Sequence, residues 1–362
     1  MSRWKIDHIA ISALILIAIV STTVFIFYVV IPSQKTKIKV LAAGSLLYPL
    51  GKVEEAFERE HPDIDVQIEG HGSIQVIRQV TELNEKADLL MVADYSLIPL
   101  MMYQSYAQEN NESYADWYVR FASNKIVLAY TASSKYADEV NITNWFSVLT
   151  RPNVVFGFPN PMVDALGYRA LMTIQLAQNY YGNNSIFYDL VTKNFDPPIS
   201  SIPSDNDSVI IVPEIQQPKA NVILRASSIQ LIPLLQVGGM DYCFLYLSNA
   251  RQYGFRYLEF PDEFNLGNPQ YDPLYARATV RFELQRFATV GMDRLGKTIY
   301  YGLTIPNNAL QKDLANEVAE FLLNGEGRNI FESAWHPLLA QCYTDHLQDT
   351  PSTFQNLLRQ EQ

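Results

Sequence analysis

The chain has 362 residues, of which 48% are hydrophobic and 18% charged, and its formal net charge at pH 7 is −11. This length predicts two domains of about 100–200 residues each, or one large two-lobed fold. The composition excludes a disordered or collagen-like chain, and the acidic balance argues against a nucleic-acid-binding protein. The charge is uneven, because residues 1–39 carry a net +4 and the remainder carries −15.

An uncharged and almost wholly apolar run extends from Ile9 to Pro32. At about 1.5 Å per residue, a helix of this length can cross the ~30 Å hydrocarbon core of a membrane. We therefore expect residues 1–37 to form a cytoplasmic tip, an uncleaved membrane anchor and a linker. A processed signal peptide is the alternative.

Four N-x-S/T sequons favour an extracellular body behind this anchor. They begin at Asn111, Asn141, Asn183 and Asn206. The two cysteines, Cys243 and Cys342, can pair or stay free, and the sequence does not decide between these states.

Strand and helix patterns alternate through the first part of the body, which predicts a mostly parallel α/β sheet. We expect strands at 38–45, 64–73 and 87–94, with helices at 46–57 and 74–83. A second α/β series follows, with strands at 124–131, 154–159, 208–213, 220–224 and 241–248, and helices at 167–181 and 228–237. We expect surface loops at 182–207 and 261–276, and a last helix at 314–335 that is interrupted at Gly325–Gly327.

The sequence contains none of the common motifs of hydrolases, zinc sites and nucleotide-binding loops. Their absence argues against an enzyme without excluding one. What recurs is a turn of small residues between a strand and a helix, at Gly44-Ser45, Gly72-Ser73 and Ser227-Ser228. Helix N-termini bind anions through free N–H groups, and serine hydroxyls add donors. A serine at such a turn is also a common helix cap, so three corresponding turns are needed to favour an anion site.

Five segments in this order resemble the archaeal tungstate/molybdate-binding proteins of ABC importers, which belong to the periplasmic-binding-protein type II class. The segments are KVLAAGSLLYPL, EGHGSIQVIRQVTEL, ADLLMVADYSLI, FPNPMVDALGYRALM and GGMDYCFLYLSNA. The resemblance implies two α/β lobes with a ligand cleft between them. It places lobe one at 38–124 plus 300–345, lobe two at 125–258, a connecting and crossing segment at 259–299 and a tail at 346–362.

The resemblance also implies an oxyanion site. Ser45 and Ser73 would come from lobe one, and Asp164 and Tyr246 from lobe two. A carboxylate repels an anion, so Asp164 fits only if its oxygen bonds the tungsten or molybdenum centre, which sulfate and phosphate do not allow. The related proteins usually supply a second carboxylate where this chain has Ser228, within RASSIQLI. Ser228 can instead donate a hydrogen bond to a tetrahedral oxyanion. The sequence therefore does not decide which of tungstate, molybdate and sulfate is the preferred ligand.

The sequence thus predicts a non-enzymatic, monomeric receptor that holds tungstate or molybdate, without a further cofactor, and passes it to an ABC permease. It would be tethered by its N-terminal helix with the binding domain outside the cell. A receptor for sulfate, phosphate or another oxyanion is the first alternative. A receptor for sugars or peptides, suggested by 22 tyrosines, and an anchored hydrolase are further alternatives.

Overall fold

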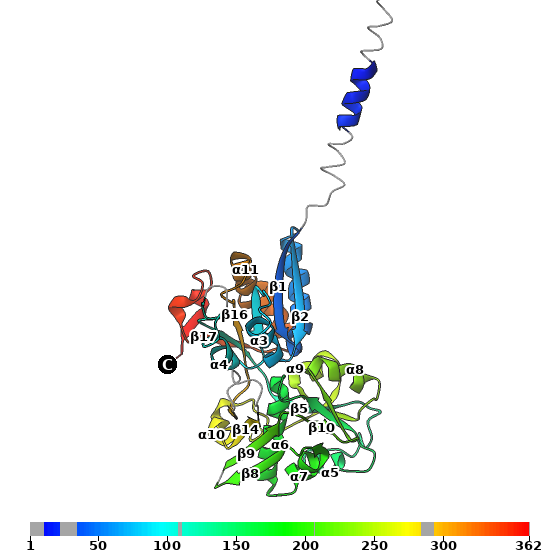
Figure 1. Ribbon diagram of the computed structural model, residues 1–362. Helices are drawn as coiled ribbons and strands as arrows, with labels where there is room; N and C mark the ends of the chain where they lie inside the picture. Colours follow the sequence, from blue (N-terminus) through cyan, green and yellow to red (C-terminus); the bar gives the residue numbers. More distant parts are fainter. Residues whose placement is uncertain (1–10, 22–34, 108–110, 206, 284–292, 362) are drawn as a thin grey trace, which may run out of the picture.

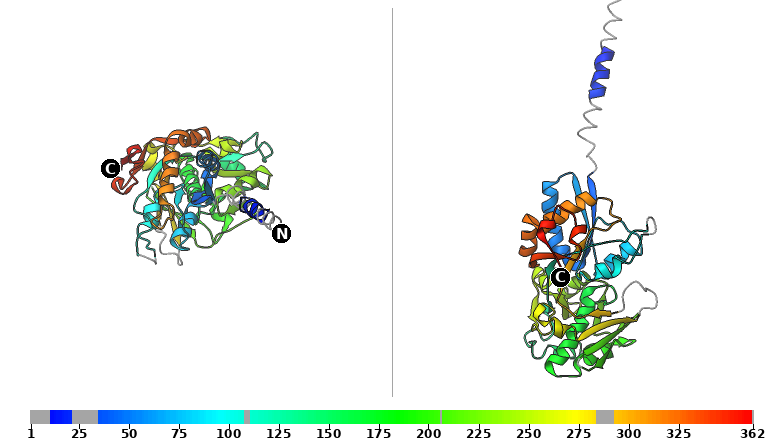
Figure 2. Two further views of the ribbon diagram at one scale, coloured as in Figure 1. Left: turned by 90° about the horizontal axis from the view of Figure 1, so that it is seen from above. Right: turned by 90° about the vertical axis from the view of Figure 1, so that its left-hand side faces the viewer.

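In the computed structural model, the chain crosses twice between two stacked α/β lobes (Figure 1). The structure describes residues 11–21, 35–107, 111–205, 207–283 and 293–361. The first crossing lies between β4 and β5, at residues 124–125, and the second lies between β15 and β16, at residues 296–299. Segments from both ends of the sequence therefore build the same upper lobe, as the colours in Figure 2 also show.

Lobe one is built on a mixed seven-stranded sheet of order β18-β17-β4-β16-β3-β1-β2. β1 lies parallel to both β2 and β3, whereas β16 pairs antiparallel with β3 and β4. The strands are β1 (Thr36–Ala43), β2 (Ile64–His71), β3 (Leu89–Val92), β4 (Val119–Ser123), β16 (Tyr300–Thr304), β17 (Leu338–Thr344) and β18 (Leu358–Gln360). The helices are α2 (Leu47–Glu60), α3 (Ser73–Thr81), α4 (Leu97–Met102), α11 (Lys312–Leu323) and α12 (Gly325–Ser333).

Lobe two contains a five-stranded sheet of order β11-β6-β12-β5-β13 and a four-stranded sheet of order β15-β14-β9-β8. The first sheet comprises β5 (Ile126–Tyr130), β6 (Phe156–Pro159), β11 (Val222–Arg225), β12 (Tyr242–Tyr246) and β13 (Arg256–Glu259). The second comprises β8 (Ser200–Ser204), β9 (Asp207–Pro213), β14 (Ala278–Glu283) and β15 (Asp293–Leu295), and a short ribbon pairs β7 (Phe195–Asp196) with β10 (Gln217–Pro218). The helices are α5 (Trp145–Leu149), α6 (Ala165–Tyr181), α7 (Ile186–Leu190), α8 (Leu231–Gln236), α9 (Leu247–Gln252) and α10 (Asp272–Tyr275).

Helix α6 is the central element of lobe two. Every residue from 165 to 177 is buried, because the helix contacts β5, β6 and β12 of one sheet and β9 and β14 of the other. A helix that is covered on all sides must be apolar all round, and α6 is apolar apart from a few polar residues. Its N-terminus points into the interface between the lobes, where Asp164 is the N-cap residue.

Four stretches of the chain differ from the sequence-based expectations. Residues 182–207, expected to be a loop, contain α7, β7 and β8, and residues 261–276, also expected to be a loop, contain α10. The segment 259–299, expected to connect the lobes, supplies β14 and β15 to a sheet of lobe two, and β14 lies parallel to β9. The tail from 346 adds β18 to the edge of lobe one, beside β17. The sheet of lobe one is also mixed rather than mostly parallel, because the strand returning from lobe two enters it antiparallel between β3 and β4.

The described part of the N-terminal region is a helix over residues 11–21 with exposed side chains. Within the described ranges, the helices are too short or too polar for any of them to cross a membrane. The rest of the predicted anchor, at 9–10 and 22–32, lies outside the described residues. The two cysteines are free and buried, one in β12 and one in β17.

Candidate functional site

The two lobe-one serines lie at the carboxyl ends of adjacent parallel strands. Ser45 follows β1 in a 3-10 turn (Gly44–Leu46), and Ser73 is the first residue of α3, after β2. Both serines are almost fully buried. The Ser73 hydroxyl accepts a hydrogen bond from the Ala93 N–H at 3.0 Å, and within the described residues its own proton has no acceptor, so it can be donated to a ligand.

Asp164 links two turns of lobe two. Its Oδ1 accepts a hydrogen bond from the Leu166 N–H at 2.8 Å and caps α6, while its Oδ2 accepts one from the Ser228 N–H at 3.0 Å. Ser228 begins a 3-10 turn (Ser228–Gln230) after β11, the strand that lies parallel to β6. Within the described chain the Ser228 hydroxyl has no hydrogen-bond partner, so it remains available to a ligand.

The two pairs of residues meet where the lobes touch. The Val163 carbonyl, next to Asp164, accepts hydrogen bonds from the N–H groups of Ile74 and Gln75 at 3.1 and 3.2 Å. A Cβ added to Gly44 would lie 3.1 Å from the Ile229 side chain. The lobes are therefore closed upon each other, and strand-to-helix turns from both lobes converge at one interface.

Tyr246, at the end of β12, connects to this interface through two neighbours. Its hydroxyl accepts a hydrogen bond from Arg169 at 2.9 Å, and its ring centroid lies 5.8 Å from that of Tyr301. The Tyr301 hydroxyl in turn lies 3.1 Å from Ser45 Oγ. The five predicted site residues thus lie at or directly behind one interface between the lobes.

Arg169 and Asp94 were missed by the sequence analysis. Arg169, in α6 of lobe two, donates to the Ala93 carbonyl of lobe one at 2.6 Å and lies 3.4 Å from Asp94 Oδ2. The Tyr168 hydroxyl donates to the same carboxylate oxygen at 2.6 Å. Burial opposes the charge of Asp94, but the cations Arg169 and Lys297 and the bond from Tyr168 outweigh it and hold the pKa of Asp94 below its usual range.

A local signal for Arg169 was present in the sequence. It lies within NPMVDALGYR and is the only charged residue of α6, a helix that reads as apolar around its circumference. A lone cation in such a helix must find a partner in the protein interior. Its partner could not be read from the sequence, because Ala93 and Asp94 belong to the other lobe.

The carboxyl group of Asp164 is electrostatically unusual. Burial raises its pKa to about 6, although the N–H groups of Leu166 and Ser228 favour the ionised form. A carboxyl with this pKa can be ionised or neutral near neutral pH, depending on what lies beside it. Among the described residues there is no cluster of three or more His, Cys, Asp or Glu residues that could hold a metal cation.

Comparison with known proteins decides the class of this two-lobed fold. The sequence model of the bacterial extracellular solute-binding proteins matches residues 38–334, which include both lobes and the interface between them. The chain belongs to this family. It is therefore an extracellular solute-binding protein, the receptor component of a transport system, and not an enzyme.

Relatives of this solute-binding protein come from several organisms. An uncharacterized solute-binding protein of Methanococcus maripaludis is 37% identical over 304 residues, which cover 84% of this chain and 87% of the relative. The molybdate/tungstate-binding protein WtpA of Pyrococcus abyssi is 35% identical over 306 residues, which cover 82% of this chain and 83% of the relative.

Solved structures share the fold at low sequence identity. The periplasmic molybdate-binding protein of Azotobacter vinelandii superposes with a TM-score of 0.53 at 14% identity, over 83% of this chain and 99% of that one. The sulfate-binding protein SubI of Mycobacterium tuberculosis has a TM-score of 0.52 at 12% identity, over 84% of this chain and 88% of that one. These likenesses establish the two-lobed fold of the solute-binding protein and carry no information on its ligand.

Proposed function

We propose that this solute-binding protein captures tungstate or molybdate in the cleft between its lobes and delivers the oxyanion to an ABC permease. The observation that carries the proposal is the meeting of four strand-to-helix turns, at Ser45, Ser73, Asp164 and Ser228, across the closed interface. The turn at Asp164 brings a carboxylate to this interface, and the turns at Ser45, Ser73 and Ser228 each bring a serine hydroxyl. Such neutral donors are suited to a small oxyanion held away from water.

Asp164 is our reason for preferring group-six oxyanions to sulfate. Its carboxylate is fixed by two N–H donors, so its remaining lone pairs are held in place rather than free to swing away. A fixed, buried carboxylate repels sulfate, but it can add an oxygen ligand to tungsten or molybdenum. The similarity to WtpA of Pyrococcus abyssi supports the same choice.

Sulfate is the second candidate, and Ser228 favours it. Among the described residues the Ser228 hydroxyl has no hydrogen-bond partner, and it is a donor suited to a tetrahedral oxyanion. By the resemblance to the archaeal tungstate/molybdate-binding proteins, Ser228 stands where a second carboxylate would be needed for six-coordinate binding. In this case Asp164 would serve only as the cap of α6 and as an acceptor for the Ser228 N–H.

We further propose that the apolar run from Ile9 to Pro32 tethers the protein, as a monomer, to the outer face of the cell membrane. The net charge of +4 in residues 1–39 contrasts with −15 in the remainder, which fits a membrane-proximal segment joined to an acidic receptor. An acidic surface weakens long-range attraction of anions, but the donors of the cleft are neutral and act at short range.

A thermal-shift series on the purified full-length chain tests the choice of ligand. Tungstate, molybdate, sulfate, phosphate and maltose are compared at one concentration. A ligand present at 1,000 times its Kd adds about 4 kcal/mol to the free energy of unfolding. We expect tungstate and molybdate to raise the Tm most. A response to maltose alone, or no response to either group-six oxyanion, would contradict the proposal.

The role of Asp164 is tested by Asp164→Ala. We expect the variant to lose about tenfold or more in tungstate affinity while its sulfate affinity stays constant or improves, because only the metal centre gains a ligand from the carboxylate. The control is Asp138→Ala, whose side chain is 94% exposed. Equal losses for the two anions would show that Asp164 acts only as a helix cap.

A further inference from the structure

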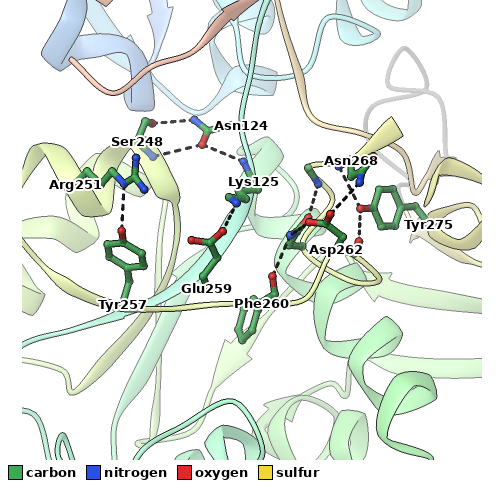
Figure 3. Close-up of polar contacts among 12 residues, drawn as sticks. Asn124, Lys125, Ser248, Arg251, Tyr257, Glu259, Phe260, Asp262, Asn268 and Tyr275 are labelled. Carbon is green, nitrogen blue, oxygen red and sulfur yellow. Dashed lines mark hydrogen bonds and ion pairs between the residues drawn. The ribbon is translucent and has the colours of Figure 1, made fainter. Parts of the chain in front are cut away.

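A cavity of about 520 Å³ lies beside the first crossing strand, and residues of both lobes line it. None of the five predicted oxyanion-site residues is part of its lining. Lobe one contributes Ser123, Glu332, Trp335 and Pro337, while lobe two contributes Leu247, Arg251 and Asp262 together with the turn at 267–269. Asn124 and Lys125, at the crossing itself, complete the wall (Figure 3). The volume lies in the range of small-molecule sites.

Most charged side chains of this cavity are already engaged. Lys125 forms an ion pair with Glu259, and Glu332 lies 3.1 Å from Arg328. Asp262 accepts hydrogen bonds from the side-chain amides of Asn265 and Asn268, both at 2.9 Å (Figure 3). Ion pairing balances the charges of Lys125 and Glu332, whereas the Asp262 carboxylate keeps its negative charge, because its partners are neutral amides.

Arg251 is the exception. Its Nε donates to the Tyr257 hydroxyl at 3.1 Å, and its guanidinium carbon lies 5.1 Å from the ring centroid of Trp335. Within the described ranges, no carboxylate is within 4.0 Å of it, so its two terminal nitrogens are free to donate to an anionic group. A guanidinium presents these donors in a fork that matches a carboxylate.

Part of the cavity lining, next to Arg251, is apolar. Trp335 is 56% exposed, and its backbone has a φ of 58°, a left-handed conformation that is uncommon for a bulky residue. Leu247, Pro269 and Pro337 lie along the same lining. An exposed indole ring beside a free guanidinium is suited to a ligand with a flat apolar body and one negative charge.

We propose that this cavity, the hinge pocket, binds a small organic carboxylate with an apolar body, whose carboxylate contacts Arg251 and whose body packs on Trp335. The site is separate from the proposed oxyanion cleft and does not depend on which oxyanion the cleft holds.

Two sets of contacts couple the hinge pocket to closure. Arg251 belongs to lobe two and Trp335 to lobe one, and beside them Gln252 donates across the interface to the Ala334 carbonyl at 2.7 Å. A ligand that touches both sides therefore favours the closed arrangement. Asn124, in the pocket wall, donates to Tyr301 at 3.3 Å, and Tyr301 reaches Ser45 of the oxyanion cleft. Binding at the two sites is thus expected to be mutually favourable.

Fluorine NMR of para-fluorobenzoate with the purified full-length chain tests the site. Neutral para-fluorobenzyl alcohol and cationic para-fluorobenzylamine are the matched probes. We expect para-fluorobenzoate to bind with a Kd of about 1 mM or below, and the two other probes to bind about tenfold more weakly. Absence of saturable binding of the carboxylate, or equal binding of the amine, would overturn the proposal.

Two variants locate the binding. Arg251→Gln and Trp335→Ala are each expected to weaken the binding of para-fluorobenzoate about tenfold. The first removes the positive charge that contacts the carboxylate, and the second removes the indole ring on which the ligand packs. The control Arg256→Gln removes another exposed cation of lobe two, which pairs with Asp138 and does not line the pocket, and should leave the affinity unchanged. Since the two pocket side chains are exposed, each variant should keep the Tm of the wild type. Binding that is insensitive to both variants would place the carboxylate elsewhere and overturn the proposal.

Adding tungstate tests the coupling and keeps the two proposals distinguishable. We expect saturating tungstate to tighten para-fluorobenzoate binding about threefold or more. By linkage, saturating para-fluorobenzoate should raise the tungstate affinity by the same factor. If tungstate does not bind at all, the oxyanion proposal fails while the hinge pocket stands on its own titration. If tungstate binds and the carboxylate affinity does not move, the coupling is overturned.

Discussion

Two features of the surroundings of Asp164 have opposite effects on the pKa of its carboxyl group. It caps α6 and holds the turn at Ser228, and both contacts favour an ionised carboxylate. Its burial nevertheless raises its pKa to about 6. Because the folded pKa lies above the unfolded value of about 3.9, this group contributes stability below about pH 4, and that contribution is lost as the pH rises through about 6.

The protonation of Asp164 predicts a pH dependence of tungstate binding. If the ionised carboxylate ligates the metal centre, affinity falls as the pH is lowered from about 7.5 to about 5.5, through its pKa. Isothermal titration calorimetry at several pH values measures this dependence. The tungstate affinity of the Asp164→Asn variant should stay constant over the same pH range. Stronger binding at low pH would mean that a neutral carboxyl donates a hydrogen bond to the oxyanion instead.

His336 titrates with the opposite sign. It is fully buried and, in the described part of the chain, neither ring nitrogen has a hydrogen-bond partner, while burial lowers its pKa to about 3. Since the unfolded value is about 6.5, the unfolded state binds more protons, and the histidine's contribution to stability is lost as the pH falls from about 6.5 to about 3.

Replacing His336 is therefore expected to be harmless or stabilising. His336→Leu keeps a similar volume between Tyr301 and Phe331 and removes a buried polar group whose lack of partners costs about 1–3 kcal/mol. Urea unfolding at neutral and acid pH checks this, with a shallower loss of stability in acid for the variant. A large loss of stability at neutral pH would show that the imidazole has a partner and a structural role.

The predicted site residues and the missed ones differ in how local their signals are. Ser45 and Ser73 stand out because a strand, a glycine and a helix follow one another within a short stretch of sequence. Tyr301 contacts Ser45 over a separation of 256 residues, and Arg169 contacts Ala93 over 76. The first pair depends on the return of the chain into lobe one and the second on the closing of the two lobes, and periodicity within one segment encodes neither.

At the scale of elements, the approach of α3 to lobe two depends on Gly72. A Cβ on this residue would lie 2.2 Å from the Val163 carbonyl oxygen and 3.0 Å from that of Ala226, both in lobe two. The glycine therefore permits closure, and nothing in its φ of −67° requires glycine.

Gly72→Ala separates closure from folding. We expect about a tenfold or greater loss of tungstate affinity, because the clash exists only when the lobes are closed, with little change in the Tm of the unliganded protein. Calorimetry and thermal unfolding are the measurements. The matched control is Gly51→Ala in α2, where an added Cβ has no neighbour within 4 Å and should add about 0.5–1 kcal/mol of stability. Unchanged tungstate affinity in Gly72→Ala would mean that binding needs no closed interface.

Elements with strong periodicity were predictable, and their partners were not. The sequence predicts a helix at 167–181, close to α6, and strands close to β1, β6 and β12, because each has a clear apolar pattern. The pairing of β14 with β9 joins segments about 70 residues apart, and β16 enters lobe one between two strands from the first third of the chain. The position of β16 is set by the second crossing of the chain, and the β14–β9 pairing by long-range folding within lobe two, so neither pairing is visible in the local sequence pattern.

At the scale of the whole molecule, a buried ion pair ties the lobes together. Asp94 of lobe one and Arg169 of lobe two are both almost fully buried in the closed state. Water can solvate both groups when the lobes separate, so their pairing affects the balance between open and closed forms rather than the folding of either lobe.

Asp94→Asn tests this balance. The variant leaves Arg169 as a buried cation without its counter-charge, which costs about 3–5 kcal/mol in comparable buried pairs and acts against closure. We expect weaker tungstate binding and, in small-angle X-ray scattering, a larger radius of gyration at a given tungstate concentration. Asp293→Asn, which removes the exposed partner of Arg281, is the control and should change neither quantity. Equal behaviour of the two variants would contradict a role of the pair in closure.

The most direct test of the account is a calorimetric titration of the full-length wild-type chain with tungstate, repeated with sulfate under the same conditions. The account predicts one saturable tungstate site per chain and sulfate binding weaker by about a hundredfold or more, because only tungstate can take the Asp164 carboxylate as a ligand. Equal affinities for the two anions, or tungstate heats that do not saturate, would contradict it.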